Sequence, residues 1–180
     1  MGLAYSSFGQ LTYITAQKSK SFEIENNRYL PVAVPKTLQK KRCANVYVET
    51  INRQGVDIRM TNAARTFVDV LDRVELCGGW EEVCRSISKL VVLNIDEVID
   101  YCLRFENARL NAKVGYFLSL RQGAFEVTEH QLIPLIKNSP KAPQYVSKSP
   151  EKKFQFVSLW NIYLPESVIN RTWEEPDAEV

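Results

Sequence analysis

Polar and apolar residues alternate with a helical period across the stretch Thr61–Trp80. Phe67, Val68 and Leu71 stand at positions i, i+1 and i+4, so they share one face of a helix. The pair Gly78-Gly79 then permits a turn that side chains would resist. The pattern therefore predicts a short helix that begins near the polar end of the stretch, buries this apolar face and stops at the glycines.

Period-two patterns in the first sixty residues predict strands. The connection Glu25–Asn27 suits a hairpin turn because Asn tolerates a left-handed backbone, and Asn52–Gly55 supplies a glycine for a second turn. Pro31 and Pro35 restrict the strand that contains them to an edge or a bent position. The expected strands are Leu11–Thr15, Ser21–Ile24, Arg28–Val34, Val46–Ile51 and Val56–Met60.

Helical periodicity continues from Asn62 to about Lys137. Asn94 and Thr128 each stand three residues before Glu or Gln, which is the pattern of a capping box, and Asn107 is a break between helices. Pro134 makes the last helix short or kinked. One amphipathic stripe is expected to comprise Trp80, Val83, Cys84, Ile87, Leu90 and Val91.

Beyond the helices, prolines and lysines mark residues 139–153 as a loop, and Phe154–Leu164 has strand character. This strand is expected to return to the N-terminal sheet, and the acidic tail Glu174–Val180 is expected to fray. The predicted fold class is α+β, with N-terminal antiparallel β-hairpins, a central cluster of about five helices and a C-terminal returning strand. We expect one domain over 1–180 with two lobes, divided into β-rich 1–60, helical 61–138, and loop, strand and tail 139–180.

Composition adds little beyond the class of a soluble protein. Hydrophobic residues make up 45% and charged residues 24% of the 180 positions, which is ordinary for a globular domain. No apolar run approaches the roughly 20 residues of a membrane span, and the N-terminus lacks a signal-peptide core. We therefore expect a cytoplasmic protein without a membrane partner.

Cysteine and histidine use argues against a metal site or a bound cofactor. The four cysteines show no C-x-x-C spacing and sit in or beside apolar stripes, so we expect small buried hydrophobes in a reducing compartment. The single histidine, His130, cannot complete a Cys/His ligand set and is expected at the surface. The cysteines are Cys43, Cys77, Cys84 and Cys102.

Positive charge is concentrated in the first third of the chain. Residues 1–60 carry nine Lys or Arg against four Asp or Glu, residues 61–138 nine against eleven, and residues 139–180 five against six. The densest basic run contains Lys36, Lys40, Lys41 and Arg42. Such a run can neutralise phosphates, or it can be an ordinary solvated surface, and no aromatic residues interleave with it to stack on bases.

The familiar catalytic motifs are absent: there is no phosphate-binding glycine loop, dinucleotide fingerprint, nucleophile elbow or H-E-x-x-H. Asp69 and Asp72 are three residues apart and could form a metal or acid/base pair on one helix face. Arg65 and Arg73 lie around the same side, where (i, i+4) pairs of Arg65 with Asp69 and of Asp69 with Arg73 would neutralise it. The residues favour a protein without enzymatic activity, and a metal-dependent enzyme using the two aspartates stays as an alternative.

Several segments together resemble a known family. They are VDIRMTNAARTFVDVLDR at 56–73, GGWEEV at 78–83, KVGYFL at 113–118, WNIYLP at 160–165 and NRTWEE at 170–175. This set resembles the C-terminal domain of AbiEi-type antitoxins, which belong to bacterial abortive-infection, type IV toxin–antitoxin systems for phage defence. The similarity extends from about Leu11 to Glu175.

Two departures from the family pattern stand out. The family's glutamate before Arg-Thr is Ala64 here, and with Thr61 as N-cap that glutamate would close a capping box at the third helical position. Family members also carry an N-terminal winged helix-turn-helix that binds operator DNA, and this sequence begins after that module would have ended.

The resemblance implies an antitoxin or transcriptional-regulator module that counteracts a nucleotidyltransferase-like toxin, with or without a stable complex, and that works with operator DNA. An alternative is a DNA-contacting accessory domain that uses the basic first third. The candidate partner-binding residues are Arg65, Asp69, Asp72 and Arg73, and the candidate nucleic-acid-binding residues are Lys36, Lys40, Lys41 and Arg42.

Overall fold

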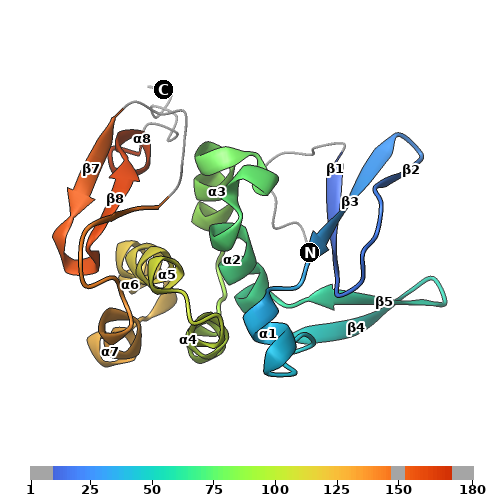
Figure 1. Cartoon of the computed structure of the whole chain (residues 1–180), viewed down its shortest axis with the longest axis horizontal. Coiled ribbons are helices and arrows are strands. Elements are labelled where there is room, and N and C mark those ends of the chain that lie inside the picture. The colour runs from blue at the N-terminus through green and yellow to red at the C-terminus, as the bar shows by residue number, and fades with distance from the viewer. Residues whose placement is uncertain (1–9, 147–152, 172–180) are drawn as a thin grey trace.

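Strands occupy the two ends of the chain and helices the middle, in a computed structural model that describes residues 10–146 and 153–171 (Figure 1). The strands are β1 (Gln10–Thr15), β2 (Phe22–Ile24), β3 (Asn27–Ala33), β4 (Val48–Arg53), β5 (Val56–Thr61), β6 (Gln144–Tyr145), β7 (Phe154–Val157) and β8 (Ile162–Pro165). The helices are α1 (Lys36–Lys40), α2 (Ala63–Asp72), α3 (Gly79–Ser88), α4 (Ile95–Arg104), α5 (Ala108–Leu120), α6 (Gln122–Phe125), α7 (Glu129–Lys137) and α8 (Glu166–Ile169), with 3₁₀ turns η1 (Val74–Cys77) and η2 (Ser158–Trp160). The predicted α+β class is confirmed.

The N-terminal sheet has the strand order β1-β3-β2. The hairpin between β2 and β3 is confirmed, and its turn residues Glu25 and Asn26 have φ of 48° and 66°, as the left-handed tolerance of Asn predicts. Strand β1, whose partner the sequence did not indicate, pairs with β3 in parallel. Pro31 lies beyond the last residue of β3 that pairs with β2, so its missing N–H faces an unpaired edge.

Strands β4 and β5 form a separate two-stranded antiparallel ribbon, which confirms the second predicted hairpin. The turn is shorter than the sequence suggested: Arg53 pairs directly with Val56. Gln54 and Gly55 between them have φ of 53° and 83°, the backbone that a tight two-residue turn demands. The ribbon leads straight into α2.

Helix α2 is the buried spine that the sequence predicts. Phe67, Val68 and Leu71 are each at most 1% exposed. The predicted N-cap, Thr61, is wrong: Asn62 caps the helix, and its side-chain oxygen accepts from the backbone N–H of Arg65 at 3.0 Å. Position 64 is therefore the second helical residue, so a glutamate there would not stand at the third position that a capping box requires.

The remaining helices begin where the caps predict. Asn94 and Asn107 cap α4 and α5, and Thr128 forms a complete capping box with Gln131 at the start of α7. A short extra helix, α6, follows α5, so six helices lie in the segment for which about five were expected. The stripe on α3 is confirmed up to Ile87 but not at Val91, which is 82% exposed because the helix ends at Ser88.

The C-terminal run does not return to the N-terminal sheet, and that prediction is wrong. Strands β6, β8 and β7 form a third sheet of their own, at the opposite end of the molecule from β1, β2 and β3 (Figure 1). The even spacing of aromatic residues is broken by η2 and by Asn161, whose φ of 50° turns the run into a hairpin. The expected frayed tail, 174–180, lies outside the described residues.

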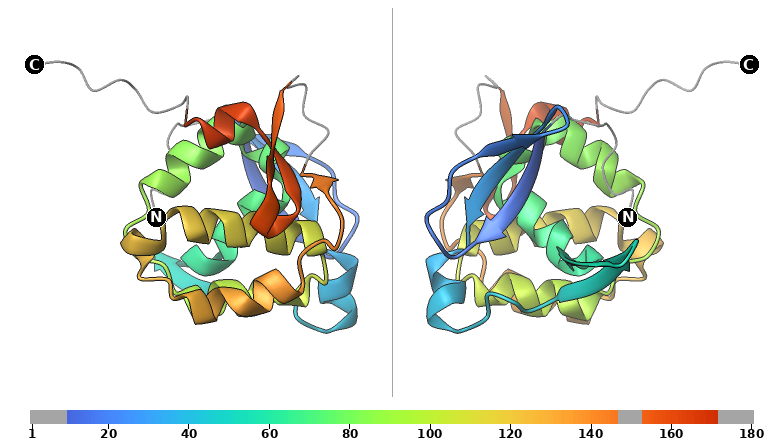
Figure 2. Two further views of the ribbon diagram at one scale, coloured as in Figure 1. Left: turned by 90° about the vertical axis from the view of Figure 1, so that its left-hand side faces the viewer. Right: turned by 90° about the vertical axis from the view of Figure 1, so that its right-hand side faces the viewer.

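The C-terminal sheet rests on the helices through one buried side. Trp160, Ile162 and Leu164 are each at most 1% exposed. The Trp160 indole lies directly over Gly115 of α5, where an added Cβ would overlap the ring. The sheet thus covers one end of the helical cluster (Figure 2, left). Each helix in the described part of the chain is too short or too polar to cross a bilayer.

Candidate functional site

Arg65, on the predicted central helix, is buried and holds neighbouring segments together. Its side chain is 1% exposed, and its Nη1 donates to the carbonyl oxygens of Ala44 at 2.9 Å and Val46 at 2.8 Å. Its Nε donates to Asp69 Oδ2 at 3.3 Å, and the guanidinium carbon lies 5.1 Å from the Tyr101 ring centroid. The expectation that Arg65 is exposed is wrong, because its donors hold the chain before β4 onto α2.

Asp69 belongs to the same internal network. Its Oδ1 accepts from the Tyr101 hydroxyl at 3.0 Å, so both carboxylate oxygens have partners. Burial raises the pKa of Asp69 although Arg65 and Tyr101 oppose the shift, and burial likewise raises the pKa of the Tyr101 phenol. The predicted (i, i+4) pair of Arg65 with Asp69 is confirmed. This arrangement links α2 to α4.

Asp72 and Arg73 stabilise the end of α2. Arg73 Nε lies 3.4 Å from Asp72 Oδ2, and its Nη2 donates to the carbonyl oxygen of Ala33 at 2.7 Å. Arg73 thus pairs with its neighbour and ties α2 to β3, whereas the sequence predicted a pair with Asp69. Lys113 of α5 donates to the carbonyl oxygen of Leu71, and burial lowers the pKa of its ammonium group.

The four residues predicted to form a partner surface are therefore largely internal. The side chains of Asp69, Asp72 and Arg73 are 25%, 21% and 25% exposed, and Arg65 is covered. The two aspartates have separate partners, Tyr101 with Arg65 for one and Arg73 for the other. Within residues 10–146 and 153–171, no three His, Cys, Asp or Glu side chains gather where they could hold a metal ion.

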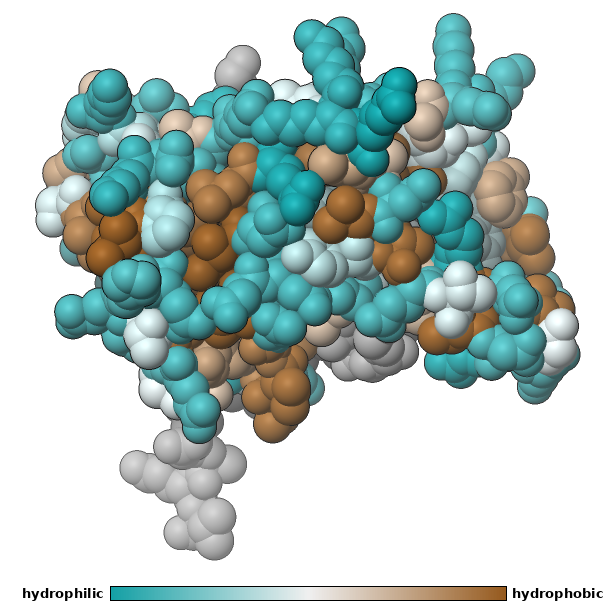
Figure 3. All heavy atoms as spheres, turned by 90° about the horizontal axis from the view of Figure 1, so that it is seen from below, coloured by the Kyte–Doolittle hydropathy of each residue, from teal (hydrophilic) through white to brown (hydrophobic). Residues whose placement is uncertain are grey.

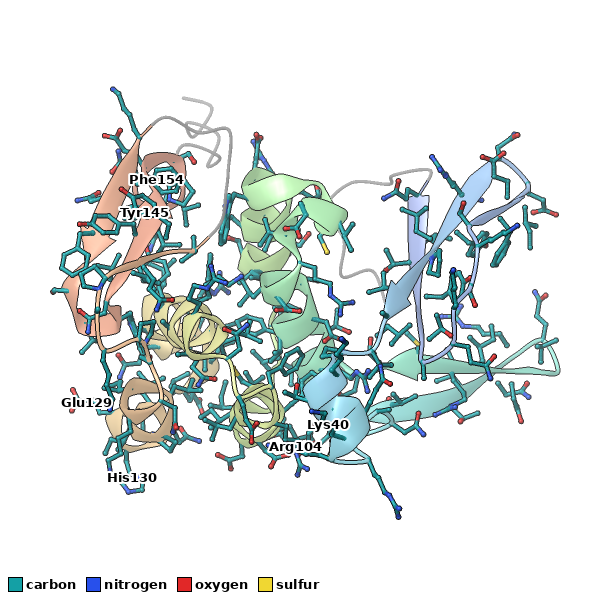
Figure 4. The ribbon with its side chains drawn as sticks, viewed as in Figure 1. Lys40, Arg104, Glu129, His130, Tyr145 and Phe154 are labelled. Carbon is teal, nitrogen blue, oxygen red and sulfur yellow. The ribbon has the colours of Figure 1, made fainter. Side chains whose placement is uncertain are left out.

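The cysteines and the histidine lie as the sequence suggested. Cys43, Cys84 and Cys102 are buried free thiols, and Cys77 is partly buried. Burial raises the pKa of Cys77 to about 11, which keeps it a thiol at neutral pH. His130 is exposed on α7 (Figure 4).

The basic run forms a small exposed turn of helix at α1. Leu38 is fully buried beneath it, so α1 is anchored by one apolar side chain and presents its cations outward. Lys41 Nζ lies 2.5 Å from Glu106 Oε1, while Arg104 of α4 pairs with Asp100 at 2.8 Å. In projection, Lys40 and Arg104 lie beside each other at the lower edge (Figure 4), on a face that is mostly hydrophilic with separate hydrophobic patches (Figure 3). The exposed members of the run are Lys36, Lys40, Lys41 and Arg42.

A cavity of about 380 Å³ lies between β1 and the helices α2 and α3. Its lining is mainly apolar and includes Leu11, Phe67, Val70, Ile87 and Leu90, with Thr66 and Glu82 among the polar members. No pattern in the sequence pointed to it, because β1 and α3 are brought together only by the fold. Among the described residues that line it, Glu82 is the only charged one.

Aromatic side chains on the outer faces of two sheets are the feature that motif reasoning missed. On the N-terminal sheet, Phe22 stacks on Tyr29 with ring centroids 4.8 Å apart. On the C-terminal sheet, Tyr145 stacks on Tyr163 at 4.7 Å. The available signal was the period-two placement of Phe154 and Phe156, which alternate with polar or partly exposed neighbours.

Comparison of the chain with protein-family models, with curated proteins and with solved structures found no match in any of the three.

Proposed function

We propose that this chain is a non-enzymatic antitoxin and transcriptional-regulator module of the AbiEi type, cytoplasmic, and directed against a nucleotidyltransferase-like toxin. The observation that carries the proposal is the internal use of the motif's polar side chains. Arg65, Asp69 and Arg73 each bond to other parts of the fold. A motif of this kind specifies an architecture, and it leaves recognition to the surface.

Other motif residues also have packing roles. Trp80 is 6% exposed and stacks on Phe117, with ring centroids 6.1 Å apart and planes at 9°. Gly78 adopts φ of 85° between η1 and α3, a backbone that favours glycine. Gly115, from the matching segment 113–118, admits the Trp160 ring of the segment 160–165. The resemblance thus rests on residues that pack against one another although they lie far apart in the sequence.

The surface candidates for a partner shift to α1, because the α2 residues are covered. Lys36, Lys40 and Arg42 are exposed, the first two on a helix anchored by Leu38 and the third just after it. A cationic turn of this kind can meet an acidic protein surface, where charge complementarity sets the association rate.

The proposal is tested by co-expression of the chain with the toxin gene that neighbours it. Restored growth is expected with the native chain, and loss of rescue is expected for the triple change Lys36→Glu, Lys40→Glu and Arg42→Glu at equal soluble protein level. The matched control replaces two exposed cations of the same third, Lys18→Glu and Lys20→Glu, and should rescue fully. No rescue by the native chain, whether alone or fused to a winged helix-turn-helix, overturns the proposal.

A second candidate function is a DNA-contacting accessory domain, which the exposure of the α1 cations favours. Replacing Lys40, Lys41 and Arg42 with glutamate should abolish retention on heparin and on duplex DNA, since each lost phosphate contact weakens binding in a salt-dependent way. Unchanged retention would exclude this patch. The Lys41–Glu106 ion pair makes Lys41 the least available of the three.

A further inference from the structure

The C-terminal sheet presents aromatic rings on one side only. Tyr145 pairs with Tyr163 in register across β6 and β8, and Phe156 pairs with the same Tyr163 across β7 and β8. Paired residues point to the same face of a sheet, and alternate residues point to the other. The neighbours Ile162 and Leu164 are fully buried against the helices, so the rings point outward.

These rings form a continuous layer, here called the aromatic face, made of Tyr145, Phe154, Phe156 and Tyr163. Tyr145 and Tyr163 are stacked with planes at 16°, and Phe154 meets Tyr145 edge-on with centroids 5.0 Å apart. Tyr145 and Phe156 remain 55% and 42% exposed. Tyr145 and Phe154 lie together at the end of the molecule (Figure 4), which Figure 2 views head-on at left.

Lysines flank the strands of the aromatic face in the sequence. Residues 137–153 contain five lysines and one glutamate, a local net charge of +4. In the described part of this segment Lys137, Lys141 and Lys153 are exposed, and the last two stand shortly before β6 and immediately before β7. This combination of rings and cations is the one that the α1 run lacks.

We propose that the aromatic face binds single-stranded RNA, with bases stacked on the exposed rings of Tyr145 and Phe156 and phosphates neutralised by Lys141 and Lys153. Three-stranded sheet surfaces with outward aromatic rings suit base stacking, because every base offers a π-face. The phenol hydroxyls of Tyr145 and Tyr163 have no hydrogen-bond partner in the described part of the chain, so each is available to a ribose 2′-hydroxyl, which DNA lacks.

Charge disfavours a second copy of the chain as the occupant. Two copies packed through their aromatic faces would bring Lys141 and Lys153, which adjoin β6 and β7, toward the same lysines of the other copy, and like charges across an interface oppose association. A polyanion is instead attracted by Lys141 and Lys153. This inference is independent of the antitoxin proposal, since binding of RNA and rescue from a toxin are measured separately.

The test is fluorescence anisotropy of a labelled uridine 12-mer titrated with the purified chain. Removing a ring on which a base stacks should weaken binding by about fivefold or more for Tyr145→Ala and again for Phe156→Ala. Lys141→Gln with Lys153→Gln, which leaves the packing of the sheet intact, should reduce the slope of log K against log salt by about 1.4. The matched control is Phe22→Ala, an exposed aromatic residue on the other sheet, which should bind like the native chain.

Three results would overturn the proposal. The first is absence of binding by the native chain at millimolar concentration. The second is equal or tighter binding of a deoxyuridine 12-mer, which would remove the RNA assignment. The third is a native dimer in sedimentation that Tyr145→Ala dissociates while anisotropy stays flat, which would make the aromatic face an interface between copies. Circular dichroism of each variant establishes that a loss of binding is not a loss of fold.

Discussion

Replacing Arg65 with methionine gives the most direct measure of how the fold is held together. The change keeps a long apolar side chain and removes the guanidinium. Two backbone carbonyl oxygens and the Asp69 carboxylate then lose their hydrogen-bond donor inside the protein. Removing one partner of a buried, hydrogen-bonded charge pair costs about 3–5 kcal/mol. Single-domain proteins have a total stability of about 5–15 kcal/mol, so this one substitution removes a large part of it.

Urea unfolding and thermal unfolding, both followed by circular dichroism, measure this loss of stability. At about 2–4 °C per kcal/mol for a domain of this size, the melting temperature should fall by about 6–20 °C. Arg65→Lys keeps the charge but lacks the planar fork, so it should lie between native and Arg65→Met. The control Arg109→Met, at an exposed arginine of α5, should stay within about 0.5 kcal/mol of native.

A double-mutant cycle separates the charge pair from the carbonyl contacts. Asp69→Asn should destabilise the native chain, yet in the Arg65→Met background it should restore part of the loss, because it removes a carboxylate left without its cation. If Arg65→Met lowers the free energy of unfolding by less than about 1 kcal/mol, at an unchanged dependence on urea concentration, the stabilising role of the Arg65 hydrogen bonds is refuted. It would mean that water or a neighbouring donor satisfies the two carbonyls equally well.

Three further outcomes are expected. Gly115→Ala should destabilise by about 1–3 kcal/mol in thermal unfolding, despite alanine's helix propensity, because its Cβ meets Trp160, and Trp160→Leu should relieve the loss. The Asn62 side-chain amide donates to Glu97 at 2.7 Å. Asn62→Asp keeps a helix cap but places a carboxylate against Glu97, so the urea midpoint should fall. Adding Glu97→Gln to this variant should restore the midpoint. Hydrogen bonds from the Arg104 guanidinium hold the pKa of Asp100 below its ordinary value. The ionised Asp100 therefore stabilises the fold above pH about 4, and this contribution is lost as the pH falls below that. In Asp100→Asn, the free energy of unfolding should depend less on pH in this acidic range.

Local signals in the sequence predicted local structure well. Caps at Asn94, Asn107 and Thr128 start helices because a side-chain oxygen accepts a free backbone N–H wherever the chain offers one. The apolar face of α2 is buried because any amphipathic helix must cover its stripe. The hairpin turns follow from residues that tolerate positive φ.

Pairing between distant segments was not predictable from these patterns. A strand's period shows which side is apolar but not which strand lies beside it, so the partner of β1 was left open and the C-terminal strands were placed in the wrong sheet. Arg65 looked solvent-exposed because its two carbonyl partners, at Ala44 and Val46, belong to a segment about twenty residues away. The aromatic face required the register of three strands before its rings could be grouped.

The separation of the two outer sheets has a practical consequence for assembly. The α1 cations lie toward the end that carries β4 and β5, and the aromatic face lies at the other end. The helical cluster lies between them (Figure 1). A large partner seated at one end leaves the other end open. A protein partner on the α1 cations and RNA on the aromatic face, as proposed above, would therefore occupy separate ends of the molecule, and neither would have to displace the other.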